Sequence, residues 1–172
     1  MSAGGDGPEL DPLDFDEFFL RELPRLVALL TALTGQRAVA EELAQEALLR
    51  AHVRWNRISK YDSPSAWARR AALNLANNAW SRRRTESRLV ARLGSLPPAR
   101  ETAAVDHEFW ATVRQLPDRQ ATAVVLHYLD DLSVRDVAAA MGCAEGTAKA
   151  HLHKGRTNLA LLLENPETTH GP

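Results

Sequence analysis

The chain has 172 residues, of which 45% are hydrophobic, 6% aromatic and 25% charged, enough for one ordinary domain or two small ones. The low aromatic content and the scarcity of β-branched runs argue against a large sheet. A single cysteine excludes an internal disulfide framework, and no apolar run approaches the roughly 18 residues that a membrane span needs.

The net charge of -1 is unevenly distributed along the chain. Residues 1–53 hold four Lys/Arg and ten Asp/Glu. Residues 54–92 hold ten Lys/Arg and two Asp/Glu, and residues 93–172 hold seven Lys/Arg and ten Asp/Glu. Such basic blocks commonly bind polyanions, so the middle segment is a candidate nucleic-acid surface. The N-terminus lacks the basic-then-apolar order of a signal peptide, so we expect a cytoplasmic protein without membrane insertion.

Helical periodicity begins after a Gly-, Pro- and Asp-rich segment, residues 1–13, which we expect to be disordered. Apolar residues then recur at helical spacing up to Gly35, and Pro24 predicts either a kink or a new helix start. A second helix is predicted over residues 37–55. It carries an acidic stripe, which composition alone favours as a solvated face, formed by Glu41, Glu42, Gln45 and Glu46.

A third helix with an unusual surface is predicted over residues 64–84, where Ser63 followed by proline makes a good helix start. Tryptophans, asparagines and arginines lie beside an apolar, alanine-rich face. This mixture suits single-stranded nucleic acid, because bases stack on indole rings, amides bond to base edges and guanidiniums hold phosphates. The alternative is that Trp67 and Trp80 are core residues, and the two interpretations are about equally supported.

A second helical domain is predicted over residues 105–164. It follows a linker, residues 85–104, whose Leu-Pro-Pro-Ala sequence cannot continue a helix. Its first two helices are predicted over residues 105–115 and 118–129. The tail, residues 165–172, is expected to fray.

Two helices joined by a tight turn complete this domain. Ser133 is a good N-cap with Asp136 in the first turn, and Gly142 stands where a left-handed helix end needs glycine. A second helix begins near Glu145, and its face opposite the apolar side carries Lys149, His153 and Arg156. The pattern predicts a helix-turn-helix, whose second helix can enter a DNA major groove. An ordinary helical hairpin with a solvated basic face is the alternative.

No combination of residues in this chain predicts catalysis. The sequence lacks a phosphate-binding glycine loop, an HExxH motif, a nucleophile elbow and paired cysteines. Cys143, His151 and His153 are close in sequence, but histidines two positions apart point to different helix faces. We therefore expect a protein that is not an enzyme, with no catalytic residue, no metal site and no cofactor.

Two independent segments resemble the extracytoplasmic-function (ECF, group 4) sigma factors of the sigma-70 family of bacterial transcription initiation. Sigma region 4 is similar to Leu116-Pro-Asp-Arg-Gln120, Leu126-His-Tyr-Leu-Asp-Asp-Leu-Ser133 and Met141-Gly-Cys-Ala-Glu-Gly-Thr-Ala-Lys149. Sigma region 2 is similar to Leu33-Thr-Gly35, Ala40-Glu-Glu-Leu-Ala-Gln-Glu46 and Ala66-Trp-Ala-Arg-Arg-Ala-Ala-Leu-Asn74. The resemblance implies an all-α fold of two small helical domains joined by a flexible linker, with region 2 over residues 14–84 and region 4 over residues 105–164.

The resemblance implies a sigma factor that binds core RNA polymerase and directs promoter-specific transcription initiation. Region 2 of such proteins docks on a coiled coil of the largest polymerase subunit, at positions that are here Glu42, Gln45, Glu46, Leu49 and Arg50. Region 2 also recognises and melts the -10 element, and captures a flipped base in the loop over residues 56–63. The residues expected at that element are Arg57, Lys60, Trp67, Arg69, Arg70, Asn74, Asn77, Asn78, Arg82, Arg83 and Arg84.

Region 4 in this family places its second helix in the major groove of the -35 element. The residues at positions expected to face bases are Glu145, Thr147, Lys149, Ala150 and His153. Lys154 and Arg156 are expected to lie nearer phosphates. Core RNA polymerase and promoter DNA are the expected partners, and an anti-sigma factor is a further candidate that the resemblance leaves open. The alternatives are a self-sufficient helix-turn-helix regulator with a ligand-sensing N-terminal domain, and a protein-interaction module that no longer reads DNA.

Overall fold

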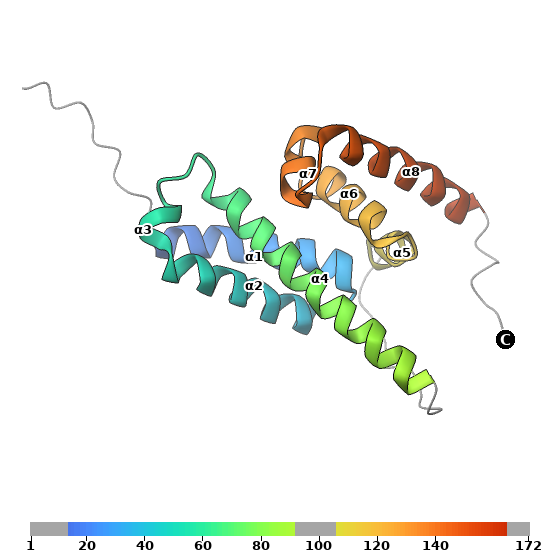
Figure 1. The fold of residues 1–172 in the computed structure, drawn as a ribbon, viewed down its shortest axis with the longest axis horizontal. Helices are drawn as coiled ribbons and strands as arrows, with labels where there is room; N and C mark the ends of the chain where they lie inside the picture. The colour runs from blue at the N-terminus through green and yellow to red at the C-terminus, as the bar shows by residue number, and fades with distance from the viewer. Residues whose placement is uncertain (1–13, 92–105, 165–172) are drawn as a thin grey trace, which may run out of the picture.

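The computed structural model describes residues 14–91 and 106–164, and within these the side chains of residues 14–79 and 108–164 (Figure 1). Over this part of the chain all regular structure is helical, which confirms the predicted fold class of two small helical domains. The first group of helices is α1 Phe15–Thr34, α2 Arg37–Val53, α3 Trp55–Ile58 and α4 Pro64–Ala91. The second group is α5 Asp106–Val113, α6 Asp118–Tyr128, α7 Val134–Met141 and α8 Glu145–Glu164. The segments expected to be disordered, residues 1–13 and 165–172, lie outside the described residues.

The first helix, α1, is continuous although Pro24 lies inside it. Pro24 is on the exposed side, and buried apolar residues recur along the other side at helical spacing: Phe18, Leu26, Leu29, Leu30 and Leu33. The helix ends at Gly35, whose φ of 71° is left-handed and whose backbone N–H donates to the Thr31 carbonyl at 2.8 Å. The stabilisation from burying one face of α1 therefore outweighs the loss of the single backbone hydrogen bond that proline removes.

The first domain is built around alanine-lined helix contacts between α1, α2 and α4. The fully buried positions of α2 and α4 are mostly alanines, namely Ala40, Ala44, Ala47, Ala51, Ala68 and Ala72. Because alanine projects so little, the helix backbones approach closely. Helix α4 therefore buries its alanine-lined side against α1 and α2, and its opposite side stays outside this core.

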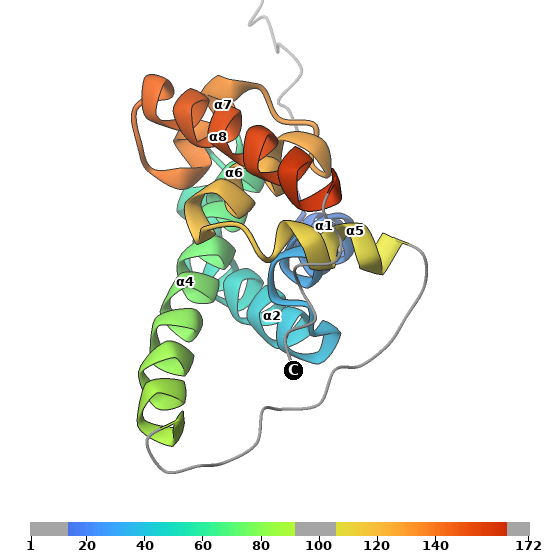
Figure 2. The same cartoon turned by 90° about the vertical axis from the view of Figure 1, so that its right-hand side faces the viewer.

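Two predicted boundaries in this domain were wrong. The predicted loop over residues 56–65 contains most of α3, so its first part is helical. Residues 85–91, predicted to be linker, continue α4. They contain neither Gly nor Pro, and the first breaker after them is Gly94, so nothing in the local sequence stops the helix. The end of α4 extends beyond the other helices (Figures 1 and 2).

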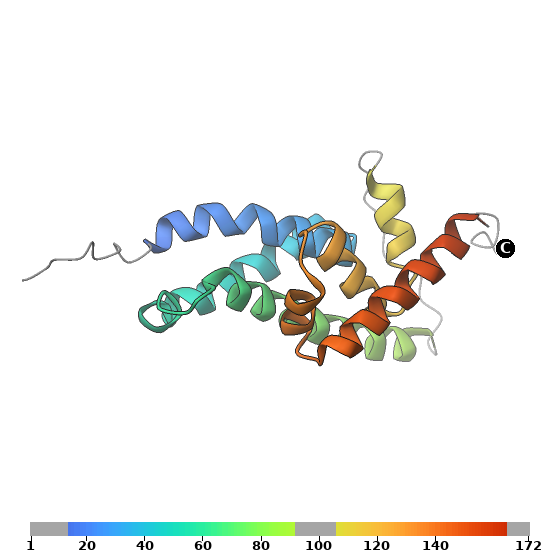
Figure 3. The same ribbon diagram turned by 90° about the horizontal axis from the view of Figure 1, so that it is seen from above.

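The second domain confirms the predicted helix-turn-helix in α7 and α8. Ser133 caps α7, accepting from the Asp136 N–H at 3.2 Å, and its hydroxyl donates to the Asp136 carboxylate at 2.6 Å. Gly142 ends α7 with a φ of 64°, and the next N–H, from Cys143, donates to the Ala138 carbonyl at 3.0 Å. Helices α6, α7 and α8 pack on one another, as the top view in Figure 3 shows for α8 crossing the domain.

The two domains also pack against each other. Helix α7 contacts α4, and both α5 and α6 contact α1 (Figure 2). Among the described helices, none combines the length and apolar character that a bilayer span requires.

We expect Gly155→Ala to lower the free energy of unfolding, because α8 crosses α6 at this glycine. An added Cβ would lie 2.8 Å from the Val124 Cγ2 and 3.3 Å from the Gln120 carbonyl oxygen. The clash should exceed the gain in helix propensity and give a net loss of about 1–2 kcal/mol in urea denaturation. The matched control, Gly146→Ala in the same helix, meets no atom within 4 Å and should be neutral or stabilising by up to about 1 kcal/mol. Equal effects at the two sites would contradict the packing.

Candidate nucleic-acid and protein interfaces

The outer face of α2 presents a stripe of acidic and apolar side chains. Glu42, Gln45, Leu49 and Arg50 are exposed, and Glu46 accepts from the Arg50 Nε at 2.8 Å. Leu49 is 58% exposed and Val53, one turn later, is 75% exposed. Uncovered aliphatic side chains between carboxylates are typical of a protein-docking surface. Val53 was not predicted to belong to this stripe, although its spacing of four residues from Leu49 indicates the same helix face.

One face of α4 brings together five of the six residues of this helix that were predicted to bind nucleic acid and whose side chains the structure describes. Arg70, Asn74, Asn77 and Asn78 are exposed and lie at helical spacings that share this face with Trp67. The Trp67 ring is partly buried and packs against the core, which agrees with the core interpretation of this residue. The side chains of Arg82, Arg83 and Arg84 lie outside the described residues.

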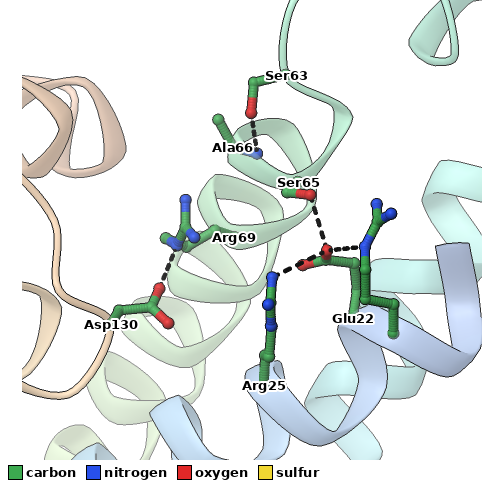
Figure 4. A network of polar contacts seen from close by, with 8 residues as sticks. Glu22, Arg25, Ser63, Ser65, Ala66, Arg69 and Asp130 are labelled. Carbon is green, nitrogen blue, oxygen red and sulfur yellow. Dashed lines mark hydrogen bonds and ion pairs between the residues drawn. The ribbon is translucent and has the colours of Figure 1, made fainter.

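Arg69 lies on a different side of α4. Its side chain is 15% exposed, and its Nε donates at 2.5 Å to the carboxylate of Asp130, which belongs to the second domain (Figure 4). The structure therefore does not bring Arg69 together with the exposed asparagines. Their grouping in the sequence rests on residue type along one helix, where the partner domain is not visible.

Helix α3 and the loop between it and α4 add basic and aromatic side chains before the start of α4. Arg57 and Lys60 are exposed, and the Arg57 guanidinium lies 6.0 Å from the centroid of the Tyr61 ring. Tyr61, which is 37% exposed, was not predicted as a site residue. The predicted N-cap is present, since the Ser63 Oγ accepts from the Ala66 N–H at 3.2 Å.

A buried carboxylate fixes the start of α4 against α1. Glu22 is 2% exposed, and its Oε1 accepts from the Ser65 Oγ at 2.8 Å and from the Arg21 Nε at 3.0 Å, with the Arg25 Nη1 at 3.7 Å (Figure 4). Negative charge beside the first turn of α4 also complements the helix dipole. Glu22 was not predicted as a structural residue from the sequence, although it lies four positions from both Phe18 and Leu26 on the buried side of α1.

The second domain presents an exposed polar face on α8. All seven positions predicted to face bases or phosphates are exposed, namely Glu145, Thr147, Lys149, Ala150, His153, Lys154 and Arg156. The Arg156 Nε donates to the Tyr128 hydroxyl at 2.6 Å, and its guanidinium lies over the Tyr128 ring at 5.6 Å. Tyr128, on α6, thus orients Arg156 and was not predicted. The described residues contain no group of three His, Cys, Asp or Glu side chains that could hold a metal ion.

Comparisons with known proteins assign both domains. Residues 18–86 match the family described as Sigma-70 region 2, and residues 106–159 match Sigma-70, region 4. The ECF RNA polymerase sigma factor EcfG of Rhodopseudomonas palustris is 32% identical over 150 residues, which cover 84% of this chain and 82% of that protein. The RNA polymerase sigma-E factor of Streptomyces antibioticus is 30% identical over 161 residues, which cover 91% of this chain and 86% of that protein.

Two solved structures share the fold. The sigma factor RpoE from Bartonella quintana, crystallised with the anti-sigma factor NepR, aligns with a TM-score of 0.69 at 27% identity, covering 88% of this chain and 97% of that chain. CnrH, solved with the cytosolic domain of CnrY, aligns with a TM-score of 0.62 at 18% identity, covering 87% of each chain.

We expect Glu22→Gln to lower the free energy of unfolding by about 1–3 kcal/mol, because the amide keeps the shape but loses the charge that three donors surround. Urea denaturation of the full chain measures this. Glu42→Gln, on an exposed helix face, should change stability by less than about 0.5 kcal/mol. A loss at Glu22 no larger than at Glu42 would show that the buried contacts do not stabilise the start of α4.

Proposed function

This chain belongs to the ECF RNA polymerase sigma factors of the sigma-70 family, and from this premise we propose which of its surfaces bind polymerase and promoter. The chain is an RNA polymerase sigma factor for promoter-specific transcription initiation, a DNA-binding regulatory subunit. The observation that carries the proposal is that one chain presents three separate exposed helical faces, an acidic and apolar one on α2 and two polar, partly basic ones on α4 and α8.

The α2 stripe is the docking surface for core RNA polymerase. Its residues are Glu42, Gln45, Glu46, Leu49 and Arg50, to which the structure adds the exposed Val53. Apolar contact at Leu49 and Val53 supplies affinity, because burying their exposed surface is favourable. The flanking charges set register and exclude partners of the wrong charge.

The -10 element is recognised by α4 and the loop before it. The exposed amides Asn74, Asn77 and Asn78 bond to base edges, while Trp67 and Tyr61 offer ring faces for unstacked bases. Arg57, Lys60 and Arg70 hold phosphates, and we propose the same role for Arg82, Arg83 and Arg84 from the sequence alone. Flipping a base costs a few kcal/mol, which stacking and amide contacts together offset. Arg69 is engaged elsewhere in this structure and takes no part while it is paired with Asp130.

The -35 element is read by α8 in the major groove. Glu145, Thr147, Lys149, Ala150 and His153 face base edges, and Lys154 and Arg156 hold phosphates. Tyr128 keeps the Arg156 guanidinium in one orientation, which lowers the entropy lost on binding.

We propose region 2 over residues 14–84 and region 4 over residues 105–164, with the last residues of α4 extending past the region 2 boundary. The chain acts in the cytoplasm with RNA polymerase and has no catalytic activity of its own. An anti-sigma factor is a further partner, a proposal supported by the solved complex of the similar sigma factor RpoE with NepR.

The test is transcription from genomic fragments of the source bacterium by purified core RNA polymerase, with and without this chain. Discrete start sites that share -35 and -10 elements support the proposal. Core binding without initiation would contradict the promoter assignments. Specific operator binding without any polymerase binding would instead favour an autonomous helix-turn-helix regulator.

We expect Glu46→Lys to abolish core polymerase binding in a pull-down, because it reverses a charge at the centre of the α2 stripe. Glu41→Lys is the matched control. It breaks an equivalent i, i+4 pair, with Arg37 at 2.7 Å, and Glu41 is as exposed as Glu46, at 43% against 44% of the side chain. Glu41→Lys should therefore retain binding. Equal retention by both variants would refute the docking surface.

We expect Lys149→Ala to cost about 1–3 kcal/mol of promoter binding by the holoenzyme and to relax its preference among -35 sequences, because Lys149 faces base edges. Lys154→Ala should weaken binding to all sequences equally and reduce the salt dependence. Competition binding with a panel of -35 variants separates these effects. A uniform loss for Lys149→Ala would make it a phosphate contact only.

A further inference from the structure

Residues 59–63 join α3 to α4 and form the α3–α4 loop. The loop starts after Ile58, the last residue of α3, which is 1% exposed and belongs to the apolar core. The N–H groups of Lys60 and Tyr61 donate back to the carbonyls of Arg57 and Ile58, at 3.3 and 3.0 Å. The last four residues of the loop are exposed, so packing against the core does not hold them. The position of the loop therefore depends on its two ends, and the second end is the start of α4.

The start of α4 is tied to α1 by a buried carboxylate. Glu22 is 2% exposed, and its Oε1 accepts from the Oγ of Ser65, the second residue of α4, at 2.8 Å (Figure 4). A hydrogen bond to an ionised acceptor is shorter and stronger than one between neutral groups. Because the carboxylate is withdrawn from water, protein donors must satisfy it, and solvent does not compete with Ser65 for this oxygen.

Glu22 does not need Ser65 to balance its charge. The Arg21 Nε lies at 3.0 Å from the same oxygen and the Arg25 Nη1 at 3.7 Å, and both arginines belong to α1. The charge is therefore compensated within one helix. What the bond from Ser65 adds is a defined position of α4 relative to α1.

The first turn of α4 connects this contact to the loop. The Oγ of Ser63, the last residue of the loop, accepts from the Ala66 N–H at 3.2 Å, and the Ser63 carbonyl accepts from the Trp67 N–H at 3.4 Å. These two bonds enclose Ser65, so the first turn moves as one unit. Holding Ser65 therefore also holds the end of the loop and the backbone that carries the Trp67 ring.

Capture of an unstacked base is sensitive to the position of such a loop. A loop that must order when a base enters loses conformational entropy, whereas a loop whose ends are already placed loses less. A wrong base is rejected only if the polar groups of the site stay where the correct base would meet them and are then left unpaired. A fixed loop end therefore raises the preference for one base as well as the affinity.

We propose that Glu22 is a positioning residue for base capture. Acting through Ser65, it fixes the α3–α4 loop and the start of α4 relative to α1, and thereby raises the preference for one base at the captured position of the -10 element. This inference rests on the proposed function for the assignment of the loop to the -10 element, whereas the contact between Glu22 and Ser65 does not.

The test uses the full chain assembled with core RNA polymerase, on a promoter from which this holoenzyme initiates. Competition binding to single-stranded oligonucleotides of the -10 element, with one base changed at each position in turn, gives the base preference as a ratio of affinities. Ser65→Ala removes the donor, Ser65→Thr keeps the hydroxyl, and Glu22→Gln is made alone and together with Ser65→Ala. Arg25→Gln is the matched control, because it removes a cation from the same carboxylate, leaves Ser65 in place and belongs to none of the proposed interfaces.

We expect Ser65→Ala to lower the preference at one -10 position about three- to tenfold, the effect of losing one hydrogen bond. Ser65→Thr and Arg25→Gln should keep the preference. Glu22→Gln should lower it in the original chain but not further in the Ser65→Ala chain, because two residues that act through one contact are not additive. A general loss of folded protein would instead lower the apparent affinity for all sequences alike, and preferences among -35 sequences should not change in any variant.

An unchanged preference in Ser65→Ala, an equal loss in Arg25→Gln, or additive losses in the double variant would each overturn the positioning role. Failure of the proposed function is distinguishable, because the original chain itself would then show no preference at any -10 position, and the positioning role would fall with it.

Discussion

The packing of α4 against α1 and α2 is the contact on which the rest of the structure depends. Alanines at most buried positions of α2 and α4 let these helices pack closely on α1, and this brings Glu22 of α1 within hydrogen-bonding distance of Ser65 in the first turn of α4. With its start fixed and one side buried, α4 must present its remaining side to solvent. That side carries the aligned asparagines, so the same packing that folds the first domain also forms the proposed nucleic-acid surface.

In the second domain, a tight turn after α7 and a glycine within α8 set how the polar face of α8 is exposed. Ser133 and Gly142 begin and end α7 at defined residues, so α8 leaves the turn in a set direction. Gly155 then lets α8 lie close on α6 while its opposite face stays free. In both domains, therefore, small residues on the buried side decide how the polar side is displayed.

The arginines of α4 illustrate why a surface cannot be assigned from residue types alone. Arg69 and Arg70 are adjacent in a basic helix and look equivalent in the sequence. In the folded chain Arg69 is paired with a carboxylate of the other domain, and Arg70 is exposed beside the turn of the helix-turn-helix. A position one residue along a helix turns by about 100°, which here separates a largely buried ion pair from an exposed guanidinium.

The features that depend on local chemistry could be predicted from the sequence alone. These include the all-α class, the ends of α1 and α7 at left-handed glycines, the Ser63 and Ser133 caps, and the exposed face of α8, because caps, turns and helical periodicity act over a few residues. The sequence also determined the family, because the two motif sets occur in order along the chain. The partners of Glu22, Arg69, Arg114 and Arg156 could not be predicted in this way, because each side chain reaches a group 28 or more residues away in the sequence. Such contacts depend on how helices cross, and no periodicity along one helix records that angle.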